Sequence, residues 1–193
     1  GLQGRELRNL TVGILGTGKI GAAVIKNLSG FGCRILASDI RENPSLKGLC
    51  TYVDNETLYK ECDILSLHMP LLENTRHFVN AETIARMKDG VTIINCARGE
   101  LMNIPDMIRG IETQKIGALA LDVFDKEDGI YHENRRDDII SNRDMAYLRQ
   151  FPNVIMTQHM AFYTDAAVQS MVYCGIEGLC DFAKTGHTAT ELV

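Results

Sequence analysis

Three side chains of this sequence have the chemistry to bind an anion and move a proton: Arg98, Glu127 and His159. An arginine fork can hold a carboxylate through two parallel hydrogen bonds. A histidine can give and take a proton near neutral pH, and a carboxylate beside it favours the imidazolium form and raises its pKa. Taken singly, each of the three is more typical of a solvated or loop residue. Their meaning depends on what the fold places beside them.

Residues 16–21 predict a turn that binds a nucleotide. Residues 11–15 form a short apolar run typical of a buried parallel strand, and residues 22–28 carry apolar side chains at helical spacing. Between them, Gly16 permits a tight turn, Gly18 lets a pyrophosphate approach the backbone, and Gly21 lets the helix pack close to the strand. The positive end of the helix then faces the phosphates. Three glycines alone would fit an ordinary loop, but the flanking strand and helix favour nucleotide binding.

An acidic residue directly follows the next predicted strand and indicates which dinucleotide binds. Asp39 follows the strand at residues 34–38. A carboxylate at this place can bond both hydroxyls of the adenosine ribose, and its charge would repel a 2′-phosphate. The sequence therefore predicts NAD rather than NADP as the cofactor.

Strands and helices alternate along the rest of the chain. Further strands are predicted at residues 51–53, 64–68, 91–95, 117–121 and 154–157, and helices at 56–61, 80–87, 105–112 and 144–149. This pattern predicts an α/β fold, a doubly wound parallel sheet of the Rossmann type with a C-terminal helix. Ligands on such sheets bind at the carboxyl ends of the strands. We therefore expect one rim of the sheet to carry Gly16, Asp39, Met69, Pro70, Cys96, Ala97, Arg98 and Asp122.

The last part of the chain combines a charged segment and a long helix. Residues 125–149 are dense in charge and typical of a solvated excursion. Thr164 is a predicted helix cap, Asp165 favours the positive end of that helix, and Gly186 ends it. An apolar face runs from Val168 to Ala183, and we expect its methionine, Met171, to serve packing.

Composition excludes several classes of function. The 193 residues suit one domain, and the net charge of −5 argues against a nucleic-acid partner. No apolar run approaches the length that spans a bilayer, and no signal peptide is evident, so no membrane partner is expected. The cysteines lack the spacing of a metal site, and no metal is predicted. We interpret them as reduced core thiols of a cytoplasmic protein: Cys33, Cys50, Cys62, Cys96, Cys174 and Cys180.

Taken together, these motifs resemble the D-isomer-specific 2-hydroxyacid dehydrogenases. The matching stretches are residues 11–21, 67–70, 95–99, 120–124 and 152–164, which follow the family's order over nearly the whole chain. The long segment between Glu127 and Pro152, and residues 161–164 after the histidine, resemble the D-lactate and (R)-2-hydroxyisocaproate branch. A phosphoglycerate-type member has a much shorter segment there.

The resemblance implies a role for each matching residue. Arg98 would bind the substrate carboxylate, His159 would protonate the keto oxygen as hydride arrives, and Glu127 would set the pKa of His159. Phe162 would shape the pocket for the substrate side chain. The residues that would contact NAD are Gly16, Gly18, Lys19, Ile20, Gly21, Asp39, Met69, Pro70, Thr75, Cys96, Ala97, Arg98 and Asp122.

The chain also departs from the family. Gln158 stands where proline usually precedes the catalytic histidine, and Asn103 stands where aspartate is usual. Nothing corresponds to the family's N-terminal substrate domain. We expect residues 1–9 to be a connector from that domain, residues 10–163 to form the NAD-binding domain, and residues 164–193 to form a C-terminal helix and tail. Without the facing domain water would not be excluded, so we expect this piece to bind NAD but to turn over poorly.

The implied function is an NAD-dependent oxidoreductase that reduces a small 2-keto acid to the D-2-hydroxy acid. The resemblance also implies a homodimer formed through this domain. An alternative is an NAD(H)-sensing binding module, like the corepressors that resemble this family, because such a protein can keep the same fold and the same three residues. Another Rossmann enzyme, such as a hydrolase with bound NAD, accounts less well for Arg98, Glu127 and His159. The substrate side chain stays open between methyl, isobutyl and benzyl.

Overall fold

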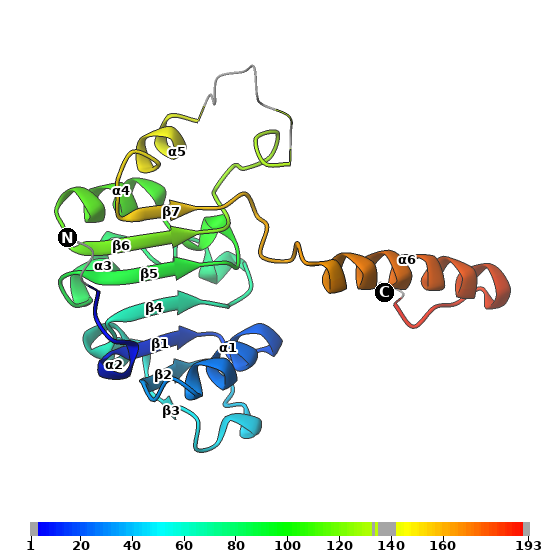
Figure 1. The fold of residues 1–193 in the computed structure, drawn as a ribbon, viewed down its shortest axis with the longest axis horizontal. Helices are drawn as coiled ribbons and strands as arrows, with labels where there is room; N and C mark the ends of the chain where they lie inside the picture. Colours follow the sequence, from blue (N-terminus) through cyan, green and yellow to red (C-terminus); the bar gives the residue numbers. More distant parts are fainter. Residues whose placement is uncertain (1–3, 133, 135–141, 191–193) are drawn as a thin grey trace. The chain divides into compact units, whose positions relative to one another are not determined.

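The computed structural model describes residues 4–132, 134 and 142–190. Within them, seven parallel strands form one sheet in the order β3-β2-β1-β4-β5-β6-β7 (Figure 1). The order reverses between β1 and β4, which is where a doubly wound sheet opens its ligand crevice. The predicted fold class is confirmed. The strands are β1 (Thr11–Leu15), β2 (Arg34–Ser38), β3 (Thr51–Tyr52), β4 (Ile64–Leu67), β5 (Val91–Asn95), β6 (Ile116–Leu121) and β7 (Val154–Met156).

Six α-helices are present in the described part of the chain, and polar side chains cap several of them. Asp54, Asn80 and Thr164 each accept a backbone N–H at the start of a helix. Asn103 caps another by accepting the N–H of Asp106 at 3.2 Å, so the departure from aspartate keeps a good cap. The helices are α1 (Lys19–Ser29), α2 (Asn55–Glu61), α3 (Ala81–Arg86), α4 (Ile104–Glu112), α5 (Arg143–Leu148) and α6 (Asp165–Thr185). Short 3₁₀ turns are η1 (Leu7–Asn9), η2 (Pro44–Leu46), η3 (Glu73–Thr75) and η4 (Gly99–Leu101).

The sheet separates two apolar cores because alternate side chains of a strand point to opposite faces. Val12 and Ile14 of β1 pack with Ile25 of α1 on one face. Leu15 and Leu65, from β1 and β4, belong to the larger core on the other face. That larger core also contains buried side chains from α2, α3, α4 and α5, namely Leu58, Tyr59, Ile84, Met107, Ile111, Met145 and Leu148.

Part of one sheet face is not covered in the described structure. In β5, Val91, Ile93 and Asn95 are buried, whereas Thr92 and Ile94 are half-buried. Ile155 of β7 is 67% exposed. Parallel sheets usually bury both faces, but the described residues bury only one face over this half of the sheet.

The chain divides into two compact units, residues 1–158 and 159–193. The second unit consists mainly of α6, and no residue of this helix is buried. Its apolar side chains Met171, Val172, Ile176, Leu179 and Phe182 are exposed. The expectation that Met171 packs in a core is therefore wrong for this structure, because the second unit contains no further element that could form an apolar layer against the helix.

The cysteines correct a second expectation. All six are free thiols, but only Cys62 is buried, and Cys96, Cys174 and Cys180 are exposed. Two of the exposed thiols lie on α6, which buries none of its residues.

The charged segment predicted as a solvated excursion lies partly outside the described residues, at 133 and 135–141. No helix in the described ranges is long and apolar enough to cross a membrane.

The packing of α1 gives a prediction about stability. A Cβ at Gly21 would lie 2.0 Å from the carbonyl oxygen of Gly16, which is backbone and cannot rotate away. We expect Gly21→Ala to lower the free energy of unfolding by about 1–3 kcal/mol, the usual cost of overpacking. Urea unfolding followed by circular dichroism measures the change. Gly175→Ala is the control, because no atom lies within 4 Å of its Cβ position; equal stability of the two variants would contradict the close contact.

Candidate functional site

The glycine turn brings the ends of β1, α1 and β4 together. Gly16 has φ 92°, and its Cβ would lie 2.7 Å from the carbonyl carbon of His68 and 2.7 Å from the nitrogen of Met69. Only glycine fits this combination of left-handed backbone and close approach. Gly18 differs, because no atom lies within 4 Å of its Cβ position. The backbone is therefore open above Gly18, which is the space a pyrophosphate needs, and the geometry fits a dinucleotide.

A hollow of about 450 Å³ lies against this turn. The start of α1 lines this hollow, and the unpaired backbone N–H groups at a helix start favour an anion. His68 lines it and its Nε2 lies 2.9 Å from Oγ of Ser66; burial lowers the pKa of His68, so the ring is neutral at neutral pH. The residues lining the hollow are Gly18, Lys19, Ile20, His68, Met69, Pro70, Leu71, Cys96, Ala97 and Arg98.

A second hollow, of about 320 Å³, shares Met69 and Pro70 with the first. It is lined by Leu15, Gly16, Ser38, Asp39, Ile40, Asn55, Met69, Pro70, Leu72, Asn74, Thr75 and Phe78. Thr75 closes one side by donating its hydroxyl to the carbonyl of Pro70 at 2.8 Å. Ile40 and Leu72 are 98% and 55% exposed, and such apolar walls suit a planar base. Sequence reasoning missed these two, although Ile40 directly follows the acid.

Asp39 is held by the glycine turn that it faces. Its Oδ2 accepts the backbone N–H of Thr17 at 2.5 Å and the Thr17 hydroxyl at 3.1 Å. Its Oδ1 accepts the N–H of Arg41 at 3.3 Å. Burial opposes ionisation, but these hydrogen bonds outweigh it and lower the pKa of Asp39. The side chain is therefore a fixed carboxylate at the edge of the second hollow.

Asn95 shapes the loop that carries Arg98. This side chain is fully buried; its Nδ2 donates to the carbonyl of Arg98 at 2.8 Å and its Oδ1 accepts the N–H of Ala97 at 2.9 Å. Arg98 is exposed at the hollow and donates to the carbonyl of Ala97 at 2.7 Å. Although Cys96 is exposed as a residue, partial desolvation of its thiol, with the charge of Asp122, raises the pKa of Cys96, so the thiol is protonated at neutral pH. Asn95 was not predicted as a site residue, although it directly precedes the predicted run.

Asp122 and Glu127 lie at and beyond the end of β6. Asp122 is buried, and its Oδ1 accepts the hydroxyl of Thr157 at 2.5 Å, which ties β6 to the chain that leaves β7. Glu127 accepts the backbone N–H of Phe124 through Oε2 at 2.7 Å. A Cβ at Gly99 would lie 2.1 Å from the carbonyl carbon of Phe124. The loop after Arg98 therefore contacts the loop that leads to Glu127 directly through backbone.

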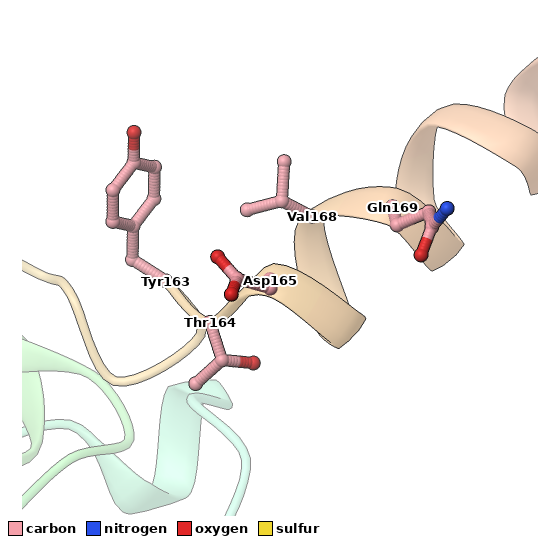
Figure 2. A pocket seen from close by; sticks show the side chains of 5 residues that line it. All are labelled: Tyr163, Thr164, Asp165, Val168 and Gln169. Atoms are coloured by element: carbon pink, nitrogen blue, oxygen red, sulfur yellow. The ribbon is translucent and has the colours of Figure 1, made fainter.

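His159 and Phe162 belong to the second unit, and their roles stay predictions. His159 has φ 54°, which is unusual for a residue other than glycine. A hollow of about 410 Å³ lies within this unit at the start of α6. Figure 2 shows that Tyr163 and Val168 stand on one side of the backbone with the Asp165 carboxylate between them, while Thr164 points to the other side. None of the predicted site residues lines this hollow.

Comparisons with known proteins agree with this geometry. The chain matches the family model for the D-isomer specific 2-hydroxyacid dehydrogenase, NAD binding domain, over residues 1–161. It is 44% identical over 194 residues to an aromatic 2-oxoacid reductase of Clostridium sporogenes, covering 100% of this chain and 59% of the relative. A D-lactate dehydrogenase structure from Treponema pallidum aligns with a TM-score of 0.94 and 34% identity, over 100% of this chain and 58% of that one. The NAD complex of a D-isomer specific 2-hydroxyacid dehydrogenase from Lactobacillus delbrueckii ssp. bulgaricus aligns with a TM-score of 0.91 and 33% identity, over 98% and 58%.

The chain therefore belongs to the NAD-binding domain of the D-isomer specific 2-hydroxyacid dehydrogenases. This confirms the predicted family, the Rossmann fold and NAD as the cofactor. The chain spans less than two thirds of the length of the relatives named above.

The position of Asp39 gives a prediction about the cofactor. We expect Asp39→Ala in the complete protein to weaken NADH binding and to narrow the gap between NADH and NADPH, because the carboxylate can bond ribose hydroxyls and repels a 2′-phosphate. Titration calorimetry with each cofactor measures both effects. Asp89→Ala is the control, because Asp89 lies outside both hollows and pairs with Lys115. A wild type that already prefers NADPH would contradict the prediction.

Proposed function

We propose that the complete protein containing this chain is an NAD-dependent oxidoreductase that reduces a small 2-keto acid to the D-2-hydroxy acid. The observation that carries the proposal is the position of Arg98, which lines the same hollow as Gly18 and Lys19 of the glycine turn. A residue suited to bind a carboxylate thus lies on the dinucleotide groove of a chain from this family. The names of the relatives support the same class of reaction: an aromatic 2-oxoacid reductase, a D-lactate dehydrogenase and a D-isomer specific 2-hydroxyacid dehydrogenase.

Each reacting group has a role in this proposal. NADH, when bound, supplies the hydride that adds to the keto carbon. Arg98 binds the substrate carboxylate through two parallel hydrogen bonds and polarises the keto oxygen. His159 donates the proton that this oxygen takes up, so that the carbonyl becomes a hydroxyl. Glu127 stabilises the imidazolium and orients the ring.

The residues that hold the cofactor are divided between the two hollows. Gly18, Lys19 and Ile20 lie where the pyrophosphate is expected, and Asp39 lies where the adenosine ribose is expected. The nicotinamide end would then contact Cys96, Ala97 and Asp122. Efficient turnover also needs the remaining part of the protein, because exclusion of water and alignment of the reactants require a facing surface. Poor turnover by residues 1–193 alone therefore stays part of the proposal.

Three further features stay predictions: a homodimer formed through this domain, a cytoplasmic location, and the shaping of the substrate pocket by Phe162. The relatives leave the side chain of the substrate open, since one is named for aromatic 2-oxoacids and another for D-lactate. No observation favours the NAD(H)-sensing module, and none of the three relatives named here carries such a description.

Replacement of the proposed acid tests the mechanism. We expect His159→Gln in the complete protein to lower kcat by about 10²–10⁴-fold, the usual contribution of general acid catalysis, with NADH binding little changed. Loss of NADH absorbance with saturating 2-keto acid measures the rate. The control is His77→Gln, since His77 lines neither cofactor hollow. Unchanged turnover of His159→Gln would contradict the proposal that His159 is the general acid.

A substrate panel tests the reaction class. We expect the complete protein with NADH to reduce at least one of pyruvate, 2-ketoisocaproate and phenylpyruvate, because Arg98 can bind the carboxylate that all three share. Chiral chromatography should show the D-hydroxy acid. An L product, or NADH binding without turnover of any keto acid, would count against the proposal, and the second result would favour a sensing module.

A further inference from the structure

Thr17 lies between Gly16 and Gly18, and the glycine turn itself does not require the side chain of this residue. It is 3% exposed. Its backbone N–H and its hydroxyl both donate to Oδ2 of Asp39, at 2.5 Å and 3.1 Å. The hydroxyl of Tyr52, from the edge strand β3, donates to Oγ1 of Thr17 at 2.9 Å. A chain of hydrogen bonds therefore connects the outermost strand of the sheet to the acid at the second hollow.

The ends of this chain determine the direction of every bond in it. The backbone N–H of Asn43 donates to the Tyr52 hydroxyl oxygen at 2.8 Å, and an amide N–H can only donate. At the other end, the ionised carboxylate of Asp39 can only accept. The Tyr52 proton must therefore point to Thr17, and the Thr17 proton to Asp39. We call the side chains of Tyr52 and Thr17 the relay.

A further hydrogen bond holds Thr17, and strand pairing holds Tyr52. The amide of Asn43 donates through Nδ2 to the carbonyl of Thr17 at 3.1 Å, so the same residue steadies both members of the relay. Tyr52 pairs in register with Ala37 of β2, two residues before Asp39. The hydroxyl of Tyr52 and the carboxylate of Asp39 are thus held by neighbouring strands. Asp39 nevertheless stays exposed at the second hollow, where a ligand can reach it.

We infer that Thr17 and Tyr52 are positioning residues that set the preference for NADH over NADPH by holding the Asp39 carboxylate in one orientation. The inference rests on the proposed function, in which Asp39 bonds the adenosine ribose. Without the relay the carboxylate keeps only the hydrogen bonds from the backbone N–H groups of Thr17 and Arg41, so its orientation is less restricted. Its alignment with the ribose hydroxyls then weakens, and its charge can move away from a 2′-phosphate. The first change weakens NADH binding, and the second relieves the repulsion of NADPH.

The experiment compares two cofactors in matched variants of the complete protein. Tyr52→Phe removes only the first hydroxyl of the relay, and Thr17→Val removes the second, while Thr17→Ser keeps it. Titration calorimetry gives the Kd of NADH and of NADPH for each variant. We expect Tyr52→Phe and Thr17→Val to weaken NADH binding by roughly two- to tenfold, the effect of about one hydrogen bond, with NADPH binding unchanged or tighter. Thr17→Ser should retain the wild-type ratio.

Tyr147→Phe is the control for the loss of a tyrosine hydroxyl, because Tyr147 donates to Glu112 at 2.8 Å outside both hollows. If the variants bind NADH and NADPH more weakly by the same factor, or if the ratio of the two Kd values does not change, the inference is overturned. The relay would then have a structural role only. If Thr17→Val fails to fold, Tyr52→Phe alone tests the role of the relay in cofactor preference. A wild type that binds no NADH would overturn the proposed function together with the inference, so the two failures are distinguishable.

Discussion

The contact between the backbones of Gly16 and Gly21 is the constraint on which the rest of the groove depends. The carbonyl oxygen of Gly16 occupies the space in which any other residue at position 21 would carry its Cβ. This brings the start of α1 onto the end of β1. Gly16 in turn admits the backbone of His68 and Met69 from the end of β4. The two hollows can share Met69 and Pro70 because three elements meet without side chains between them.

Polar side chains then hold the loops around this contact. Thr17 and Asp39 fasten the glycine turn to β2, Asn95 shapes the loop that carries Arg98, and Asp122 joins the ends of β6 and β7 through Thr157. In the described part of the chain, no buried side-chain nitrogen or oxygen lacks a hydrogen-bond partner. Because an unpaired buried polar group is costly, such a satisfied set favours one loop conformation. The exposed guanidinium of Arg98 is thus presented by a rigid support.

Apolar surface remains exposed in each of the two units. One sheet face leaves Ile94 half-buried and Ile155 exposed, and α6 buries none of its residues. The amphipathic pattern of α6 correctly indicates a helix, which begins after the Thr164 cap and ends at Gly186 with φ 75°. The same pattern says nothing about which element covers its apolar face. That is why the predicted helix is confirmed while the packing expected for Met171 is not.

Local chemistry in the sequence was sufficient to predict the elements and the roles of the glycines. Strand and helix periods, the cap at Thr164, and the requirement for small residues at Gly16 and Gly21 act within a few residues of the chain, so they can be predicted without a fold. The tertiary structure alone decided which polar groups meet. Thr17, Asp39, Asn43 and Tyr52 converge only because parallel strands distant in the sequence end at one edge. A hydrogen bond depends on distance and direction in space, and no spacing along the chain specifies either.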